Sequence, residues 1–410
     1  MRSVLFVDDE PDILSGIRRM LRGMRNEWDM QFVAGGAQAL EVLESHPVDV
    51  VVSDMRMPEM DGAQLLSVIK ERWPMTVRII LSGHSDQEVT LRSVGIAHQY
   101  LAKPCDMENL VHVISRACAL RNVLHDARLQ SLVSGLSTIP SLPALYIQIV
   151  EVLKTANPSI QSIGQIVSQD IGMTTKIMQL VNSSFFGLPR RISTLDQAVA
   201  LLGIDVIKAL VFSIQVFSQF DPQLVREAHL ENMWQHCFQV GSLARLIAME
   251  APTDSAAADE AYLAGIVHDV GKVVLGVNMQ QQYVEALQQA EKEKVSHSDK
   301  EREIFGASHA EVGAYLLGLW GFPDAIVEAV AYHHNPSESH VQCFAPVIAV
   351  HVANALDHIH GGVPSLVPGN EIDKAFLLTL DGLQLAKWLE KCRDKIKECL
   401  AHERENIAGR

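Results

Sequence analysis

The feature that most constrains the fold is an alternation of short β-branched runs with helical patterns over the first 120 or so residues. The runs are VLFV at 4–7, VDVVVS at 48–53 and VRIILS at 77–82. Alternation of this kind predicts βαβ units, and therefore a parallel sheet with helices on both faces. In such sheets, functional residues gather at the carboxyl ends of the strands.

Polar residues stand at these strand ends. Asp8 and Asp9 follow the first run, and Asp54 follows VVVS. Ser82 ends the run at 77–82, and Lys103 follows a short apolar segment around residues 100–101. The predicted fold therefore brings three carboxylates and one lysine to the same edge of the sheet.

Three neighbouring carboxylates repel one another, and a divalent cation is the simplest compensation. Oxygen ligands alone favour Mg²⁺. A lysine beside them can neutralise an incoming phosphoryl group. The edge of the sheet is therefore predicted to accept phosphate on a carboxylate, which is a known form of covalent catalysis.

Four stretches carry a resemblance to a known family: FVDDE, SDMRMPEMDG, ILSGHSD and YLAKP. In order and spacing they resemble the receiver domain of two-component response regulators, over residues 1–124. The resemblance implies a flavodoxin-like α/β domain with a five-stranded parallel sheet. It also implies a sensor histidine kinase, or a phosphotransfer protein, as the partner that supplies the phosphoryl group.

The same resemblance assigns roles to single residues. Asp54 is the expected phosphoacceptor, and Asp8, Asp9 and Asp54 are expected to hold Mg²⁺ together with the backbone carbonyl of Arg56. Lys103 is expected to pair with the phosphoryl oxygens and Ser82 to hydrogen-bond one of them. Tyr100 is expected to turn inward in the active state. The peptide bond before Pro104 falls where this family often has a cis bond, which costs little only before proline.

A helix-compatible stretch without Pro or Gly runs over residues 106–132. Its apolar residues step by three and four, the spacing of a coiled-coil seam; they are Leu110, Val113, Ala117, Leu120, Leu124 and Ala127. The first half of this stripe is expected to pack on the receiver's own sheet. The second half predicts either a rigid connector that continues the last receiver helix or a homodimer.

Residues 129–405 have the periodicity of helices, with breakers at Gly187, Pro189 and Gly203. The patterns IPSLP, NSSFFGLPRRI, LDQAVALLG, MWQHCFQV, GIVHDVGK, GASHAEVGAYLLGLWGFP and AVAYHHNP resemble, in order, the HDOD output domain. That family is related to the HD metal-dependent phosphohydrolases and is regarded as a non-enzymatic signalling or protein-interaction module. The resemblance implies an all-α output domain that is not an enzyme.

A mononuclear HD site needs two histidines, an aspartate beside the second, and a distant aspartate. By pattern, His236 matches the first ligand, and His268 and Asp269 match the central pair. Imidazole and carboxylate ligands suit Fe, Mn or Zn. Asn354 stands where the hydrolases have the distant aspartate, and a neutral amide weakens both metal affinity and the local base. Asp357, one helical turn further on, shares a face with Asn354.

Three further histidines resemble the extra metal ligands of the HD-GYP phosphodiesterases, which cut cyclic di-GMP: His309, His333 and His334. The Gly-x-Gly-Tyr-Pro segment of that subfamily is absent, because NPSESH follows the histidine pair. Two readings therefore stay open for these histidines. They either ligate a transition metal, or they cap helix ends and satisfy buried polar groups inherited from an ancestral site. Lys272 is spaced to pair with Asp269 and to supply the charge that a metal would bring.

Composition narrows the partners. Lys and Arg total 34 against 49 Asp and Glu, a formal charge of −15, which disfavours nucleic acid as a partner. There is neither a signal-peptide pattern nor an apolar stretch of roughly 20 residues that could span a bilayer, so we expect a cytoplasmic protein without membrane contact. The sequence predicts a phosphorylation-controlled adaptor whose output domain binds a protein or a small ligand. The alternative is a phospho-regulated, metal-dependent phosphodiesterase or phosphohydrolase acting on a cyclic dinucleotide or a nucleotide.

Overall fold

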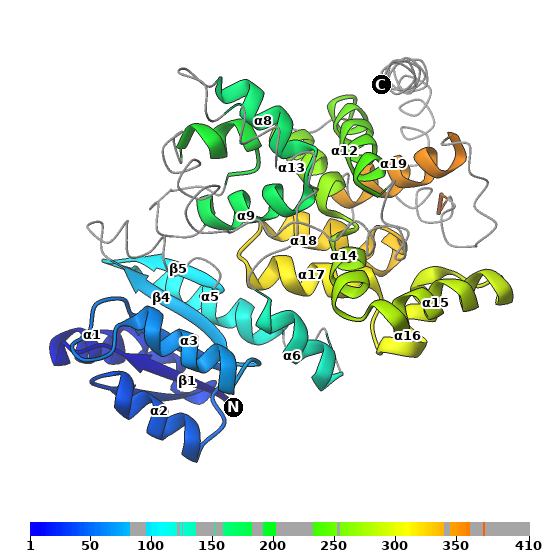
Figure 1. Cartoon of the computed structure of the whole chain (residues 1–410). Helices are drawn as coiled ribbons and strands as arrows, with labels where there is room; N and C mark the ends of the chain where they lie inside the picture. Colours follow the sequence, from blue (N-terminus) through cyan, green and yellow to red (C-terminus); the bar gives the residue numbers. More distant parts are fainter. Residues whose placement is uncertain are drawn as a thin grey trace.

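The computed structural model of the chain describes residues 1–82, 96–120, 124, 126–136, 152, 159–182, 192–201, 233–251, 255–339, 345–360 and 372–373. A parallel five-stranded sheet with its helices is followed by a helical region (Figure 1). The prediction of an α/β domain followed by an all-α domain is thereby confirmed. In the parts described, no helix combines the length and the apolar character needed to cross a membrane.

The sheet has the strand order β2-β1-β3-β4-β5, and all neighbouring strands are parallel. The strands are β1 (Arg2–Val7), β2 (Trp28–Val33), β3 (Val50–Asp54), β4 (Val77–Ser82) and β5 (Gln99–Ala102). In the register, Asp54 pairs with Leu81 and Ser82 pairs with Ala102. The carboxyl ends of β3, β4 and β5 therefore meet at one edge of the sheet.

Side chains that alternate along the strands create two apolar layers. Val4 and Phe6 point to the face covered by α1 (Pro11–Met20) and α5 (Met107–Leu120). Leu5 and Val7 point to the opposite face, covered by α2 (Gly36–Ser45) and α3 (Gly62–Arg72). A short 3₁₀ helix, η1 (Leu21–Asn26), leads into β2.

Helices make up the second region and the segment that connects it to the sheet. They are α6 (Ala127–Gly135), α8 (Ile160–Ser168), α9 (Ile171–Val181), α12 (Met233–Met249), α13 (Ser255–Val267), α14 (Val270–Asn278), α15 (Gln280–Glu293), α16 (His297–Phe305), α17 (His309–Leu319), α18 (Asp324–Tyr332), η3 (Pro336–Glu338) and α19 (Pro346–His360). The terminal pattern at 376–400 and most of the IPSLP, NSSFFG and GHSD stretches lie outside the described residues.

Glycines allow a close contact between α12 and α13 in the helical region. A Cβ atom on Gly265 of α13 would lie 2.5 Å from the Cα atom of Gly241 in α12. Only two glycines allow the backbones to approach this far, because any side chain would have to push the helices apart. The contact fixes the helix that ends at the His268-Asp269 pair against the helix that carries His236.

The prediction that the last receiver helix continues as a connector is wrong. Helix α5 ends at Leu120, and neither Leu124 nor Asp126 is helical. Asp126 is the N-cap of a new helix, since its side chain accepts hydrogen bonds from the backbone N–H groups of Arg128 and Leu129. Leu124 is buried in the chain's own core, so the apolar seam does not require a second copy. The homodimer stays a prediction.

One continuous apolar cluster joins the two regions. It includes Val4 and Phe6 from the sheet and Leu110 from α5, and it continues through α6 at Leu129 into α17 at Leu316. In Figure 1, α5 and α6 lie between the sheet and α17. The face of the sheet covered by α5 is therefore tied to the helical domain through shared packing.

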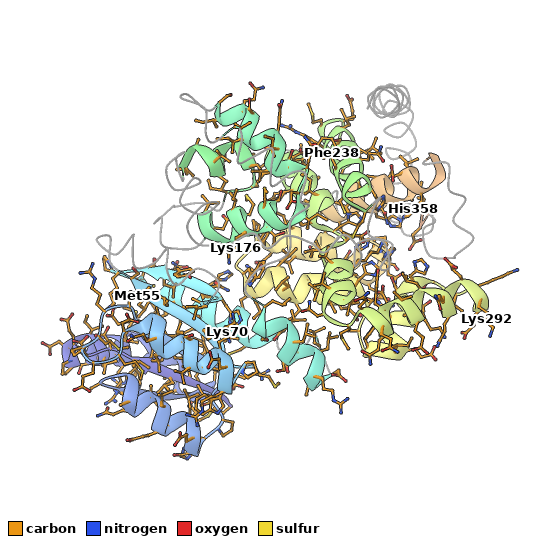
Figure 2. The ribbon with its side chains drawn as sticks, in the orientation of Figure 1. Met55, Lys70, Lys176, Phe238, Lys292 and His358 are labelled. Carbon is orange, nitrogen blue, oxygen red and sulfur yellow. The ribbon has the colours of Figure 1, made fainter. Side chains whose placement is uncertain are left out.

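Lys176 of α9 is a buried cation at this junction (Figure 2). Its ammonium group lies 5.4 Å from the centre of the Trp320 ring. Burial, together with the nearby charge of Lys70 on α3, lowers its pKa to about 7. The folded chain therefore binds this proton less tightly than the unfolded chain does. This lysine destabilises the fold at neutral pH, and the effect is relieved as pH rises from about 7 towards about 10.

Replacing Lys176 by Met should raise the melting temperature most at pH 7 and below, with the gain shrinking towards about pH 10. Thermal unfolding of native and variant chains across this pH range measures the difference. Lys292→Met, at an exposed lysine of α15 labelled in Figure 2, is the matched control and should leave the pH profile unchanged. The same melting-temperature gain at every pH would contradict the assignment of the effect to a buried proton site.

Candidate functional site

Two carboxylates and one lysine meet at the carboxyl edge of the sheet. Asp8 follows β1, Asp54 ends β3, and Lys103 follows β5. The Nζ atom of Lys103 donates to Oδ2 of Asp8 at 2.7 Å and pairs with Oδ1 of Asp54. The peptide bond between Lys103 and Pro104 is cis, as the receiver resemblance led us to expect. The structure thus brings together residues that are 46 to 95 positions apart in the chain, as predicted.

The charges in this pocket are coupled. Burial raises the pKa of Asp54, and the hydrogen bond and charge of Lys103 counteract part of that rise. Burial alone would lower the pKa of Lys103, but the hydrogen bonds to Asp54 and Asp8 outweigh it, so that the pKa is raised. The lysine therefore stays charged, which is the state needed to neutralise a phosphoryl group.

Backbone contacts hold the carboxylates in place. The N–H group of Arg56 donates to Oδ2 of Asp54 at 2.7 Å, and the N–H group of Glu10 donates to Oδ1 of Asp8 at 3.0 Å. A Cβ atom on Gly62 would lie 2.1 Å from the backbone oxygen of Asp54, so only glycine fits beneath the phosphoacceptor position. Asp9 is half-buried beside Asp8. These oxygens suit Mg²⁺, which prefers carboxylate, carbonyl and water ligands.

The remaining predicted receiver residues lie on the neighbouring strands. Ser82 is buried at the end of β4, and its backbone oxygen accepts a hydrogen bond from the N–H group of Lys103 at 2.8 Å. Tyr100 is 2% exposed and packs in the same apolar cluster as Met55 and Ile80. The tyrosine ring is therefore buried within the domain, and its role as a switch stays a prediction.

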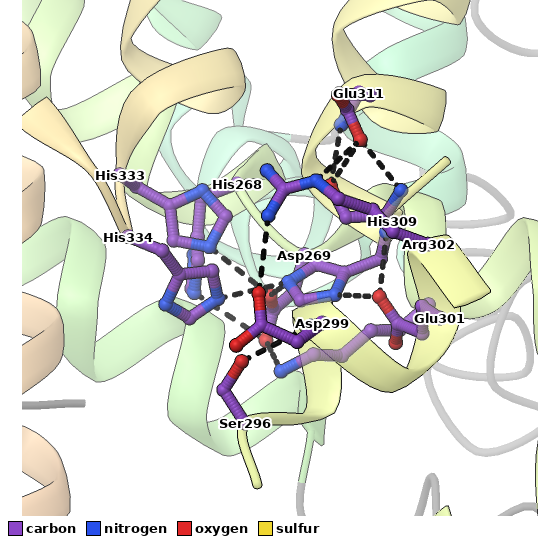
Figure 3. A network of polar contacts seen from close by, with 12 residues as sticks. His268, Asp269, Ser296, Asp299, Glu301, Arg302, His309, Glu311, His333 and His334 are labelled. Atoms are coloured by element: carbon purple, nitrogen blue, oxygen red, sulfur yellow. Dashed lines mark hydrogen bonds and ion pairs between the residues drawn. The ribbon is translucent and has the colours of Figure 1, made fainter. Parts of the chain in front are cut away.

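A second polar site lies in the helical domain, where histidines from separate parts of the chain converge on Asp269; Figure 3 shows His268, His309 and His333 around it. One oxygen, Oδ2, lies 3.4 Å from Nε2 of His268 and 3.7 Å from Nε2 of His236. The other oxygen, Oδ1, lies 3.4 Å from Nε2 of His309 and 3.7 Å from Nε2 of His333. Asp269 is thus placed between two pairs of imidazole rings, with one oxygen facing each pair.

Hydrogen bonds on the outer side of these rings fix their tautomers. In each case Nδ1 faces an oxygen that can only accept: Oδ2 of Asp357 for His236, the Gly265 carbonyl for His268, Oε2 of Glu301 for His309 and the Val330 carbonyl for His333. Nδ1 must therefore carry the hydrogen, and Nε2 of each neutral ring presents a lone pair towards Asp269. Metal-bound histidines in proteins are held in the same way.

On the inner side of the cluster, the nitrogen and oxygen lone pairs outnumber the hydrogen atoms that could bind them. Nε2 of His236 lies 3.2 Å from Nε2 of His268, and in the neutral rings both atoms carry lone pairs. Nε2 of His309 lies 3.0 Å from Nε2 of His334, which can donate a hydrogen bond to it. Within the described part of the chain, five buried atoms around the cluster have no hydrogen-bond partner: Oδ1 of Asp269, Oε1 of Glu301, Nε2 of His333, Oδ1 of Asn354 and Oδ1 of Asp357. Lone pairs at such distances repel unless a cation or a proton lies between them.

Two groups of three residues have the spacing of metal ligands, His236 with His268 and Asp269, and His309 with His333 and His334. In each group the ligand atoms lie within 4.8 Å of one another. The predicted candidate residues are therefore brought together, and the mixture of imidazole and carboxylate fits Fe, Mn or Zn.

Lys272 competes with a cation for Asp269. Its Nζ atom donates to Oδ2 of Asp269 at 2.7 Å, as its spacing predicted. Burial would raise the pKa of Asp269, but the interactions of this carboxylate with His268 and Lys272 hold that pKa well below the usual range. The carboxylate is therefore ionised in either reading of the cluster.

Sequence reasoning missed two supports of this cluster and weighed a third too lightly. Glu301 of α16 accepts from both the backbone N–H and Nδ1 of His309, and His358 lies with its ring 4.9 Å from that of His236. Asp357, expected only to compensate for Asn354, is the acceptor that orients His236. No motif marks Glu301. However, Gly306, with φ of 76°, makes a turn between Glu301 and His309, and such a turn in the sequence could have predicted that the two side chains meet.

Comparison with known families agrees with the two predicted domains. Residues 4–115 match the family model of the response regulator receiver domain, and residues 139–336 match that of the HDOD domain. The chain therefore carries a receiver domain followed by an HDOD domain. That combination makes it a response regulator with an HDOD output region.

Individual relatives cover parts of the chain. An uncharacterized protein of Treponema pallidum is 25% identical over 230 residues, which are 54% of this chain and 43% of that protein. The DNA-binding transcriptional regulator NtrC of Escherichia coli K12 is 39% identical over 115 residues, 28% of this chain and 24% of that protein. The chain thus spans less than half the length of these two relatives.

A solved structure resembles a larger part of the chain. The crystal structure of a virulence factor from Campylobacter jejuni covers 67% of this chain and 96% of its own, at 20% sequence identity and a TM-score of 0.51. At this identity the likeness concerns the fold alone.

Proposed function

We propose that phosphorylation of Asp54 controls what the HDOD domain of this response regulator binds. The observation that carries this proposal is the buried pocket in which Lys103 contacts both Asp8 and Asp54. A sensor histidine kinase, or a phosphotransfer protein, supplies the phosphoryl group, and Mg²⁺ is held by Asp8, Asp9, Asp54 and the Arg56 carbonyl. A phosphoryl group adds negative charge beside Lys103, and the surrounding strands rearrange to accommodate it.

The output domain, in this proposal, acts by binding rather than by catalysis. Asn354 supplies a neutral amide where a hydrolase has a carboxylate, and Lys272 already neutralises Asp269. The net charge of −15 favours a protein or a small ligand over nucleic acid as the downstream partner.

The test compares hydrogen exchange of the full chain with and without beryllofluoride and Mg²⁺. In the native chain, beryllofluoride should change exchange in helices of the HDOD domain. Asp54→Asn should abolish that response, since the amide cannot accept the phosphate mimic. Asp29→Asn makes the same chemical change at an exposed position of β2 and should respond as the native chain does. A response that survives in Asp54→Asn would overturn the proposal.

A second candidate function is a metal-dependent phosphodiesterase or phosphohydrolase acting on a cyclic dinucleotide or a nucleotide. The observation in its favour is the pair of Nε2 atoms of His236 and His268, 3.2 Å apart with both outer nitrogens donating elsewhere. A bound Fe, Mn or Zn ion would activate water for attack on a phosphoester. Metal analysis of the purified chain, followed by turnover assays with cyclic di-GMP and with nucleotides, tests this candidate.

A further inference from the structure

The junction between the receiver and the HDOD domain contains a buried polar chain as well as apolar packing. It starts at Arg78, in the first half of β4, and His98, just before β5. It passes through Ser134 of α6 and ends at Tyr315 in the middle of α17. All four residues are less than 2% exposed. Each link therefore joins groups that have no water to replace a lost partner.

The first link is a carbonyl oxygen shared by two donors. Nη2 of Arg78 and Nε2 of His98 both lie 2.8 Å from the backbone oxygen of Ser134. Nδ1 of His98 accepts from the backbone N–H group of Arg78, so Nε2 must carry the hydrogen that it donates. Burial and the charge of Arg78 lower the pKa of His98 well below its usual range, which keeps the ring neutral.

Arg78 is held rigidly on the receiver side. Nε donates to the Ile96 carbonyl, and Nη1 lies 3.2 Å from the carbonyls of both Pro74 and Thr76. Burial lowers the pKa of the guanidinium group to about 10, so it remains charged at neutral pH. A planar guanidinium with its donors fixed in this way transmits the position of β4 to the carbonyl of Ser134.

The second link is a single hydrogen bond between hydroxyl groups. Oγ of Ser134 and the hydroxyl oxygen of Tyr315 lie 2.9 Å apart. Further along the same face, Arg116 of α5 donates to the backbone oxygen of Phe322 and lies 3.1 Å from Oδ1 of Asp324. The receiver thus reaches the middle of α17 through α6, and it contacts the chain just beyond the carboxyl end of α17 through α5.

β4 and α17 are linked through α6 near Arg78 and Tyr315. Each of the two elements has a functional site at the end that lies away from this link. β4 carries Arg78 near its start and Ser82 at its end, beside the phosphoacceptor pocket. α17 starts at His309 in the histidine cluster and is about 16 Å long at 1.5 Å per residue. The backbone oxygen of His309 packs directly on Gly271 of α14, the helix that follows Asp269. A shift of α17 therefore cannot leave the cluster unchanged.

We propose that α17 couples the two sites, with the hydrogen bond between Ser134 and Tyr315 as the joint between receiver and output domain. This inference rests on the proposed function, because it requires that phosphorylation acts on the HDOD domain. β4 and β5 move at their carboxyl ends when Asp54 is modified, Arg78 and His98 carry the movement to α6, and the joint passes it to α17. The histidine cluster is then the part of the output domain that responds.

The test uses Tyr315→Phe in the full chain. This change keeps the ring in its apolar surroundings and removes only the hydroxyl group of the joint. Hydrogen exchange of peptides covering 305–320 is measured with and without beryllofluoride and Mg²⁺. The response in these peptides should fall by roughly fivefold, the effect expected for the loss of one hydrogen bond, while the receiver still takes up beryllofluoride.

Tyr262→Phe is the matched control. Tyr262 of α13 shares a hydrogen bond with Ser168 of α8, which is also a contact between a tyrosine and a serine but lies wholly within the helical domain. This variant should respond as the native chain does. An equal response in Tyr315→Phe and native chains would overturn the role of the joint and leave the proposed function intact. A native chain whose HDOD domain does not respond at all would overturn the proposed function, and this inference with it.

Discussion

Replacing Gly271 by Ala is expected to unfold or detach the amino-terminal end of α17. A Cβ atom at this position would lie 1.9 Å from the backbone oxygen of His309 and 2.7 Å from its carbonyl carbon. Backbone atoms cannot turn aside as a flexible side chain can, so α14 and α17 must separate. We expect a loss of stability on the order of 3 kcal/mol or more, at the upper end for overpacking in a core.

Denaturant unfolding, followed by hydrogen exchange of peptides from α14 and α17, measures this loss. Gly16→Ala is the matched control, since Gly16 is also helical but has open space where the methyl group would go. There the same change should stabilise α1 by about 0.5–1 kcal/mol through helix propensity. Equal stability of the Gly271→Ala and native chains would contradict the close contact between α14 and α17.

Replacing Asp269 by Asn is expected to abolish transition-metal binding by the histidine cluster, if the cluster holds metal. The amide keeps the size of the side chain but removes the charged oxygen that faces each pair of rings. Mutation of a residue that only hydrogen-bonds to a metal ligand already lowers metal affinity by about tenfold to a hundredfold. Loss of Asp269, which is itself a candidate ligand, should therefore weaken metal binding by more than about a hundredfold. Equilibrium dialysis against Mn, Fe and Zn, with metal analysis of the protein, measures the change.

Lys272→Met separates the two readings of the cluster. It removes the ammonium group that lies 2.7 Å from Asp269 and leaves every candidate ligand in place. Metal affinity should rise in this variant, because the competing charge is gone. Should neither the native chain nor Lys272→Met take up a transition metal, the cluster would be a hydrogen-bonded remnant, and the hydrolase candidate would be eliminated.

The receiver pocket could be predicted from the sequence because its chemistry follows from strand ends. In a parallel sheet, residues that end neighbouring strands must meet, so Asp8, Asp54 and Lys103 were brought together by topology alone. The members of the histidine cluster could also be predicted, because the sequence patterns that contain them follow one another in the order found in the HDOD family. Its geometry was not predictable, because the bridging position of Asp269 depends on how α13, α17 and α18 pack.

The end of α5 and the start of α6 were missed because the regular spacing of apolar residues was given more weight than the helix-capping signal at Asp126. Asp126 followed by Ala127 is a helix start, and the seam residue Leu124 is buried by the fold of a single chain. The polar chain through Arg78 and Ser134 could not be read from the sequence either. A charged residue near the start of a strand gives no sign of which carbonyl, 56 residues later, will accept its hydrogen bond.

The apolar cluster that runs from the sheet through α5 and α6 into α17 also limits how the chain can be divided. A receiver fragment ending at residue 120 would lose the cover that α17 gives to α5. The apolar residues on the side of α5 that faces α17 would then be exposed to solvent, and such an exposed apolar patch promotes self-association. An oligomer formed by a receiver fragment without α17 would therefore reflect the cut rather than the intact protein.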